Sequence, residues 1–191
     1  MKLDLNQQTL VKLREKYGGI IVDFLGFKLN TEQGELFDEI AEPDRYLNDR
    51  AIQTLATLLT HYSVATLKPL SGKLVKYRDL PGGCAYEEAL TRRAIEPIAM
   101  VFGEAPQGIV EAARHLGGRP QMYGDASVEI MALKGIPLTY VVWGAEDFPA
   151  SASLLFDETA SHYLPTEDLA VLGEVTSIRL METRRLGKGH L

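Results

Sequence analysis

Hydrophobic residues recur every three or four positions in the first third of the chain, which is the spacing of an amphipathic helix. One run follows Asn6, a good helix cap, and stops at Gly18, where a left-handed turn ends helices. A second run follows another asparagine, Asn48. The pattern predicts a helix behind each asparagine, with these residues facing the core: Leu10, Leu13, Tyr17, Ile52, Leu55, Leu59 and Tyr62.

Further along, the period changes to two, the spacing of a half-buried strand. Residues 128–142 alternate on both sides of Lys134-Gly135, which predicts a hairpin with a tight turn. Weaker strands are predicted at 24–29, 35–40, 73–77 and 151–156. Helices are predicted to begin near Ala85, to span 106–116 and to begin near Thr166. The last two helices should turn these residues toward the core: Ile109, Ala113, Leu116, Val171, Leu172, Val175 and Ile178.

The order of these elements indicates the fold class. Neighbouring strands look antiparallel and the helices cluster between them, so we expect an α+β fold in which helices cover an antiparallel sheet. A chain of 191 residues suits a single domain over residues 1–191, with a flexible basic tail at 184–191. The sequence contains no dinucleotide-binding glycine motif, no Walker loop and no nucleophile elbow.

Composition narrows the partners and the compartment. The chain has 20 Lys and Arg against 26 Asp and Glu, a net charge of −6 that disfavours nucleic acid. The N-terminus lacks an apolar leader, and the most apolar run, 18–27, is too short to span a bilayer. We therefore expect a cytoplasmic protein without a membrane partner. The lone Cys84 allows no internal disulfide and no iron–sulfur cluster.

The stretch FDETASHYLPTEDL, residues 156–169, gathers acidic residues around a histidine. Glu158 and His162 are one helical turn apart, and Glu167 or Asp168 is a candidate third ligand for a metal ion. Alternatively, Thr166 caps a helix whose first turn favours acidic residues through the helix dipole. The spacing does not match a known zinc motif, so we predict no metal. A ligand contact by His162 and Tyr163 and a purely structural role stay open.

A glycine loop precedes the helix predicted from Ala85. Gly82 and Gly83 let backbone N–H groups approach an anion, and Arg92 and Arg93 on the helix add positive charge. Cys84, at the helix start, is a candidate nucleophile or metal ligand. This pattern suits a carboxylate or phosphate, although paired glycines are also common in turns.

The segment after the hairpin is rich in aromatic and acidic residues. Trp143 and Phe148 are suited to wall a pocket for a flat ligand that Asp147 orients, or else they anchor the loop to the core. His115 is a candidate axial ligand for haem or cobalt, or a residue that satisfies a helix C-terminus. The sequence suggests no partner for His61 or His190.

Four motifs together resemble a domain family of unknown function found mostly in strict anaerobes: LPGGCAYEEAL at 80–90, GDASVEI at 124–130, IPLTYVVWGAEDFPASASLLFD at 136–157 and YLPTEDLAVLGE at 163–174. The N-terminal third resembles the family only loosely. Some relatives are joined to an iron–sulfur domain like that of corrinoid proteins, which implies anaerobic one-carbon or tetrapyrrole metabolism and a protein partner there. This chain departs from them, because Cys84 alone supplies no cluster motif.

Three hypotheses follow. The first is a binding protein that holds an anionic cofactor, such as a tetrapyrrole or corrinoid, between the 143–148 loop and the glycine loop. The second is a metal-assisted hydrolase or acid–base enzyme that uses Asp147, Glu158, His162 and Asp168. The third is a structural subunit of a larger complex, which predicts an exposed apolar patch.

Overall fold

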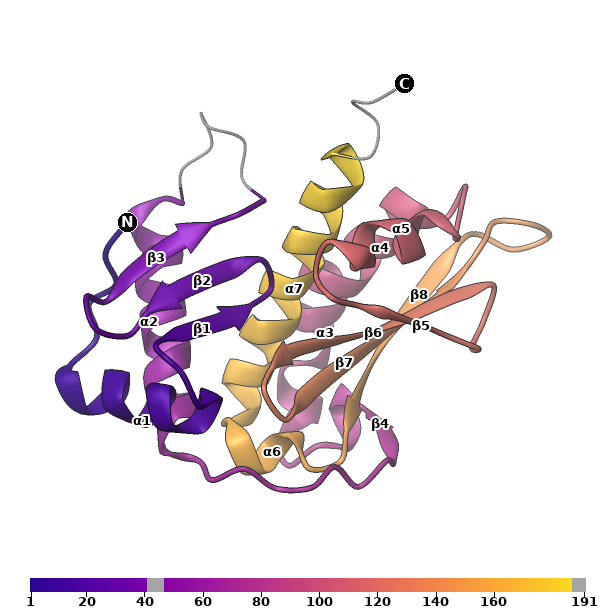
Figure 1. The fold of residues 1–191 in the computed structure, drawn as a ribbon. Coiled ribbons are helices and arrows are strands. Elements are labelled where there is room, and N and C mark those ends of the chain that lie inside the picture. The colour runs from indigo at the N-terminus through magenta and orange to yellow at the C-terminus, as the bar shows by residue number, and fades with distance from the viewer. Residues whose placement is uncertain (41–46, 187–191) are drawn as a thin grey trace.

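The N-terminal residues form a helix and a small antiparallel sheet. The computed structural model of the chain describes residues 1–40 and 47–186. Helix α1 (Gln7–Tyr17) begins where the side chain of Asn6 accepts a hydrogen bond from the Thr9 amide at 2.8 Å, and it ends at Gly18, as predicted. Strands β1 (Ile21–Phe24), β2 (Phe27–Asn30) and β3 (Glu35–Asp38) follow in that order across the sheet (Figure 1).

The predicted strand at 24–29 is wrong, because a turn divides it. Leu25 and Gly26 have φ angles of 49° and 74° and join β1 to β2 as a two-residue hairpin turn. Such turns usually carry Asn-Gly or Asp-Gly, because both central residues need a positive φ. A leucine in the first central position gives no turn signal in the sequence, so β1 was missed. The strand predicted at 35–40 is present as β3.

Helix α2 (Asp49–Val64) confirms the second predicted helix. The side chain of Asn48 accepts a hydrogen bond from the Ala51 amide at 2.9 Å and caps its first turn. An extended segment, residues 65–73, then leads to β4 (Leu74–Lys76), the strand predicted at 73–77. This segment crosses the base of the molecule in Figure 1.

The middle of the chain is helical but irregular. Two 3₁₀ turns (Tyr77–Asp79 and Gly83–Ala85) precede α3 (Glu87–Leu90), a π-helical turn (Thr91–Ile95) and α4 (Glu96–Phe102). Helix α5 (Gly108–Arg114) lies within the predicted 106–116. The helix expected from Ala85 thus begins as α-helix at Glu87, and its π turn carries Arg92 and Arg93.

The larger sheet has five strands in the order β4-β8-β7-β6-β5, all antiparallel. Its other members are β5 (Arg119–Gln121), β6 (Ala126–Leu133), β7 (Ile136–Trp143) and β8 (Ser151–Asp157). Leu133 pairs with Ile136 around Lys134-Gly135, so the predicted hairpin is confirmed. The expected alternation fails on β7, where Thr139 and Val141 are also buried because both faces of this strand are covered.

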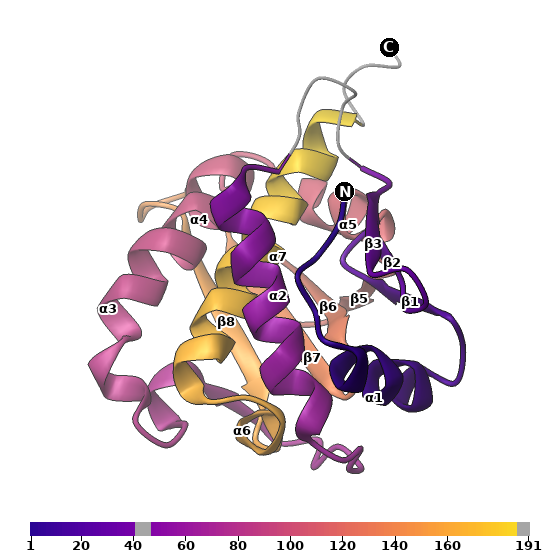
Figure 2. The same cartoon turned by 90° about the vertical axis from the view of Figure 1, so that its left-hand side faces the viewer.

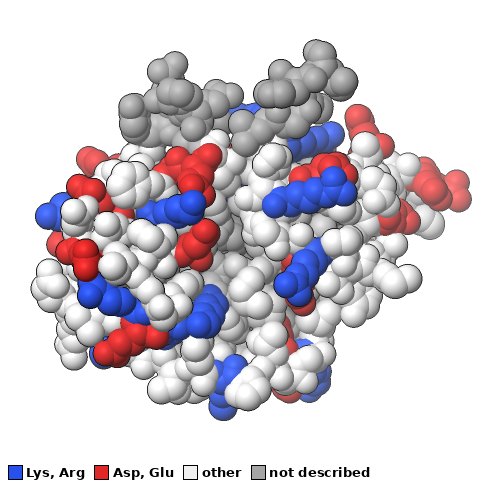
Figure 3. Space-filling view, viewed as in Figure 1, with Lys and Arg blue, Asp and Glu red and all other residues white. Residues whose placement is uncertain are grey.

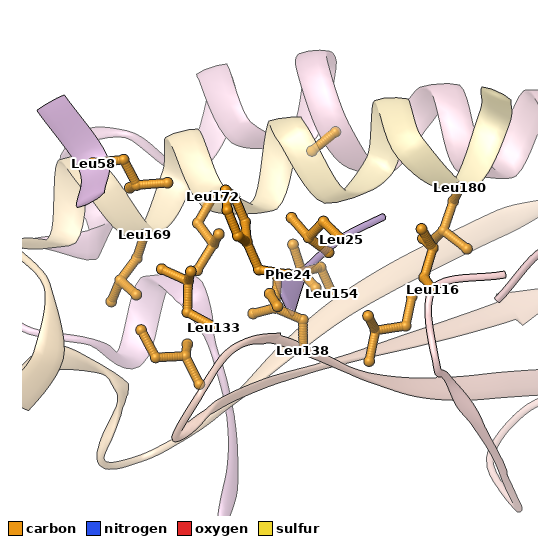
Figure 4. Close-up of a cluster of buried hydrophobic side chains, with 14 of the residues drawn as sticks. Phe24, Leu25, Leu58, Leu116, Leu133, Leu138, Leu154, Leu169, Leu172 and Leu180 are labelled. Atoms are coloured by element: carbon orange, nitrogen blue, oxygen red, sulfur yellow. The ribbon is translucent and has the colours of Figure 1, made fainter. Parts of the chain in front are cut away.

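After the short α6 (Ala160–Tyr163), the long α7 (Thr166–Leu186) runs through the centre of the molecule. In Figure 4, leucines of α7 face leucines of the larger sheet, with Phe24 and Leu25 of the small sheet beside them. The expectation that Ile178 points inward is wrong: it is 42% exposed, and Leu180 is buried instead. Helix α7 extends into the predicted tail as far as Leu186, and residues 187–191 lie outside the described residues.

The fold class is therefore α+β with antiparallel sheets and helices, as predicted. One continuous set of buried apolar side chains joins both sheets to α7. In the two described ranges, no helix combines the length and apolarity that crossing a membrane requires. Figure 3 shows acidic and basic side chains interspersed on one face, without a large basic field.

Candidate functional site

The stretch 156–169 begins with a buried carboxylate that holds another segment of chain. Asp157 accepts hydrogen bonds from the backbone amides of Ser71 (3.2 Å), Gly72 (2.8 Å) and Thr159 (3.0 Å), and from the hydroxyls of Ser71 (3.0 Å) and Thr159 (2.6 Å). Burial alone raises the pKa of Asp157, but these donors outweigh it and lower the pKa to about 2. Asp157 thus fixes the extended segment 65–73.

The other polar residues of this stretch bind the same segment. The ring N–H at Nε2 of His162 donates to the Thr66 carbonyl at 3.0 Å, and the buried Tyr163 hydroxyl bonds to both the amide and the carbonyl of Lys68, each at 2.8 Å. Glu158 pairs with Lys73 at 2.6 Å. These backbone contacts of His162 and Tyr163 are what the structural alternative expects, and a ligand contact by these residues stays a prediction.

The glycine loop lies near the start of α7, where the Thr166 hydroxyl donates to the Pro81 carbonyl at 2.6 Å. Gly82 has a φ of 77°, which favours glycine. A Cβ atom on Gly83 would lie 1.9 Å from the Tyr77 carbonyl oxygen, so this position has no room for a side chain. The exposed Cys84 donates its S–H to a backbone carbonyl. The positive φ of Gly82 and the close packing at Gly83 explain the paired glycines without a ligand.

The aromatic loop is at the other end of the larger sheet. Trp143 pairs with Ser151 at one end of β8, whereas Asp157 pairs with Leu74 at the opposite end. A strand of this length spans roughly 20 Å. The structure therefore does not bring the 143–148 loop and the glycine loop into one cleft.

The loop residues themselves are exposed. Phe148 is 82% exposed and Trp143 40%, so neither is an anchor in the core, and Asp147 is exposed as well. Met122, 99% exposed, lies in the neighbouring turn between β5 and β6. An exposed apolar group at this end is the feature that the structural-subunit hypothesis predicts, and that hypothesis stays a proposal.

The residues of the second hypothesis are likewise separated. Asp147 lies with the aromatic loop, Glu158 pairs with Lys73, and His162 binds backbone. Across residues 1–40 and 47–186, no three His, Cys, Asp or Glu side chains gather closely enough to hold a metal ion. His115 is exposed at the C-cap of α5, a position that suits its helix-terminus interpretation.

Two adjoining hollows instead form a groove between α2 and α7, which we call the α2–α7 groove; the two helices run side by side in Figure 2. Their volumes are about 520 and 320 Å³, and they share Arg50, Thr54 and Val171. The larger hollow has apolar walls, including Val175 and the exposed Ile178. The volume of the larger hollow, about 520 Å³, lies within the range of small-molecule pockets.

Three arginines line the larger hollow. Arg179, 2% exposed, is held by Asp38 (2.5 Å) and Glu182 (2.9 Å), and its guanidinium lies 4.1 Å from the ring centre of Phe27. Arg93 contacts Glu174 only at 3.8 Å, and within the described ranges Arg50 makes no ion pair. Glu174 and Glu182 line the same hollow, so among the described residues Arg50 is the guanidinium without an ion pair, and Arg93 reaches an anion only by leaving Glu174.

A histidine–carboxylate pair lies at the other end of the groove. Nδ1 of His61 on α2 is 2.5 Å from Oδ2 of Asp168 in the first turn of α7. Sequence reasoning gave His61 no partner and assigned Asp168 to His162. The sequence did contain a signal for this surface. Thr54 follows Arg50 by four positions and His61 follows Thr54 by seven, so the three residues share one face of α2.

Fold and site together define a class: a helix-covered antiparallel α+β protein with a charged groove between two helices. Comparison with known proteins gives the family of the chain. Residues 4–179 match a family described as Domain of unknown function (DUF3786), and the chain belongs to that family. The match includes the N-terminal third, where the motifs resemble the family only loosely. No curated protein and no solved structure matches the chain.

Proposed function

We propose that the protein binds an organic anion with an apolar body in the α2–α7 groove. The observation that carries the proposal is that the unpaired Arg50 and Arg93, whose ion pair with Glu174 is long at 3.8 Å, line one hollow together with an apolar wall. Arginine binds carboxylates through two parallel N–H donors, which gives both affinity and orientation. Of the residues that the sequence suggested for anion binding, this proposal keeps Arg93. Arg50 takes the place of the glycine loop as the second contact to the anion.

The remaining contacts support a preformed site. Arg179 cannot turn toward a ligand, because two carboxylates and the carbonyl of Leu25 hold its side chain. It serves as a fixed wall stacked on Phe27, while Val175 and Ile178 offer apolar contact. A site that needs little reorganisation loses less free energy on binding.

A tetrapyrrole or corrinoid is the cofactor class that the family resemblance implies. The carboxylate side groups of a porphyrin suit arginines such as Arg50 and Arg93, but the larger hollow is lined by no His, Cys or Met among the described residues, so the groove offers the metal no axial ligand. We therefore propose such a molecule only as one member of the class of organic anions. The cytoplasmic location and a partner in anaerobic one-carbon metabolism belong to the same proposal.

The test is a titration of the purified protein with metal-free protoporphyrin IX, haem and cobalamin, followed by absorbance. We expect at least one ligand to bind with a dissociation constant of about tens of micromolar or lower. Replacing both groove arginines (Arg50→Gln with Arg93→Gln) should weaken it about tenfold or more, since each lost charged hydrogen bond contributes about 1.5 kcal/mol or more.

The matched control is Arg114→Gln, an exposed arginine outside the groove, which should bind as the unaltered protein does. Equal affinity in the double variant would contradict the proposal, and absence of any spectral change at about 100 µM ligand would remove tetrapyrroles and corrinoids from it.

A further inference from the structure

The pair formed by His61 and Asp168 has the geometry of a proton-transfer group. A carboxylate only accepts hydrogen bonds, so a neutral imidazole that faces it through Nδ1 carries its proton there. Nε2 then keeps a lone pair on the far side of the ring. This is how a carboxylate orients a histidine that acts as a general base.

Both partners are fixed by rigid elements. His61 lies in the last turn of α2, and Asp168 lies in the first turn of α7, where the helix dipole favours a negative charge. The side chain of Asp168 is 17% exposed and that of His61 is 49% exposed. The carboxylate is thus sheltered while the imidazole still reaches solvent.

The imidazole borders a separate hollow on α2. This hollow has a volume of about 560 Å³ and lies between α2 and the N-terminal residues Lys2 and Asp4. Its lining combines polar and charged side chains, among them Lys2, Asp4, Gln53 and Thr57, with the apolar Ile52 and Ala56. A small molecule that carries polar groups therefore finds partners beside His61.

Stability alone explains this pair weakly. An ion pair with a half-exposed partner contributes about 0–1 kcal/mol, because water screens the charges and two side chains lose freedom. A purely structural pair would also leave the reactivity of the imidazole unchanged, which separates the two explanations by experiment.

We propose that His61 is a general base at this hollow on α2 and that Asp168 is its positioning residue. Nε2 of His61 takes a proton from a water molecule as the water oxygen bonds to the acyl carbon of a small polar ester. The bond from that carbon to the alcohol oxygen breaks, and the proton on Nε2 passes to the leaving oxygen. Water and ester thus give acid and alcohol. This proposal does not rest on ligand binding in the α2–α7 groove.

The experiment measures hydrolysis of 4-nitrophenyl acetate, a general acyl probe, by the full chain and by free imidazole at equal concentration. We expect the protein to exceed imidazole about tenfold or more, and His61→Gln to remove this excess. Asp168→Asn should also lower the rate about tenfold or more, because an amide that donates to Nδ1 favours the tautomer with the proton on Nε2. His115→Gln, at an exposed histidine with no carboxylate partner among the described residues, is the control and should keep the full rate.

Circular dichroism shows whether each variant is folded. If a variant does not fold, the unaltered protein is treated with diethyl pyrocarbonate, and the modified histidines are located by mass spectrometry. Loss of hydrolysis in step with modification of His61 supports the proposal. Equal rates for the protein and free imidazole, equal rates for His61→Gln and the unaltered protein, or full hydrolysis after modification of His61 would overturn it.

Discussion

Asp157 shows how a residue that looked like part of a site holds the fold together. Because its pKa is lowered to about 2 from an ordinary value of 3.8, its stabilising effect is complete above about pH 4 and is lost as the pH falls through 2. A shift of this size corresponds to about 2 kcal/mol. We expect Asp157→Asn to lower the free energy of unfolding by about that amount at pH 7, measured by denaturant titration, and to weaken its decline between pH 4 and 2.

Asp147→Asn is the matched control, since this aspartate is exposed in the 143–148 loop. If Asp157→Asn kept the stability and the pH dependence of the unaltered protein, the hydrogen bonds to residues 71, 72 and 159 would not have the effect assigned to them.

At the same scale, sequence separation decides what could be predicted. Asn6 and Asn48 cap helices whose first turns follow directly, so their roles were legible in the sequence. Asp157 binds a segment 86 residues away in sequence, and His61 pairs with a residue 107 positions away. A single sequence gives no signal for such contacts. Asp157 was therefore counted only among the acidic residues of a candidate site, and His61 was left without a partner.

Among the elements, the two 3₁₀ turns before α3 give a sharp test of the glycine loop. We expect Gly83→Ala to lower the free energy of unfolding by about 3 kcal/mol, because its Cβ would lie 1.9 Å from the Tyr77 carbonyl oxygen and the turns would have to separate. Gly82→Ala should cost only about 1 kcal/mol, since the position is open and only its φ of 77° disfavours alanine.

Thermal unfolding of both variants measures this difference, and protoporphyrin titration of each reports any effect on ligand binding. Equal stability for the two variants would mean that close packing does not explain Gly83. Lost ligand binding in a stable Gly82→Ala variant would return the loop to the list of ligand sites.

The elements also show where periodicity succeeds and where it fails. The 128–142 hairpin was predictable because its alternation and its Lys-Gly turn agree. The turn at Leu25 was not, because leucine rarely adopts a positive φ. On α7, the expectation placed Ile178 inward, yet the helix buries its neighbours Arg179 and Leu180, and Arg179 can be buried because its guanidinium finds acceptors on the small sheet.

For the whole molecule, Arg179 is the main polar link between α7 and the small sheet. It donates to Asp38 and to the carbonyl of Leu25, so the sheet depends on a helix more than 140 residues later in the chain. We expect Arg179→Met to lower the free energy of unfolding by about 3 kcal/mol, because a methionine keeps the apolar contact with Phe27 but donates no hydrogen bond.

The loss should be local, because the larger sheet contacts α7 through leucines that this substitution leaves in place (Figure 4). Hydrogen exchange followed by mass spectrometry measures this: amides of Val22 and Leu29 in the small sheet should exchange faster, and those of Ile130 and Leu138 should stay protected. Arg185→Met, an exposed arginine one turn and a half further along α7, should leave both sheets protected. Uniformly faster exchange would instead mean that the two sheets unfold as one unit.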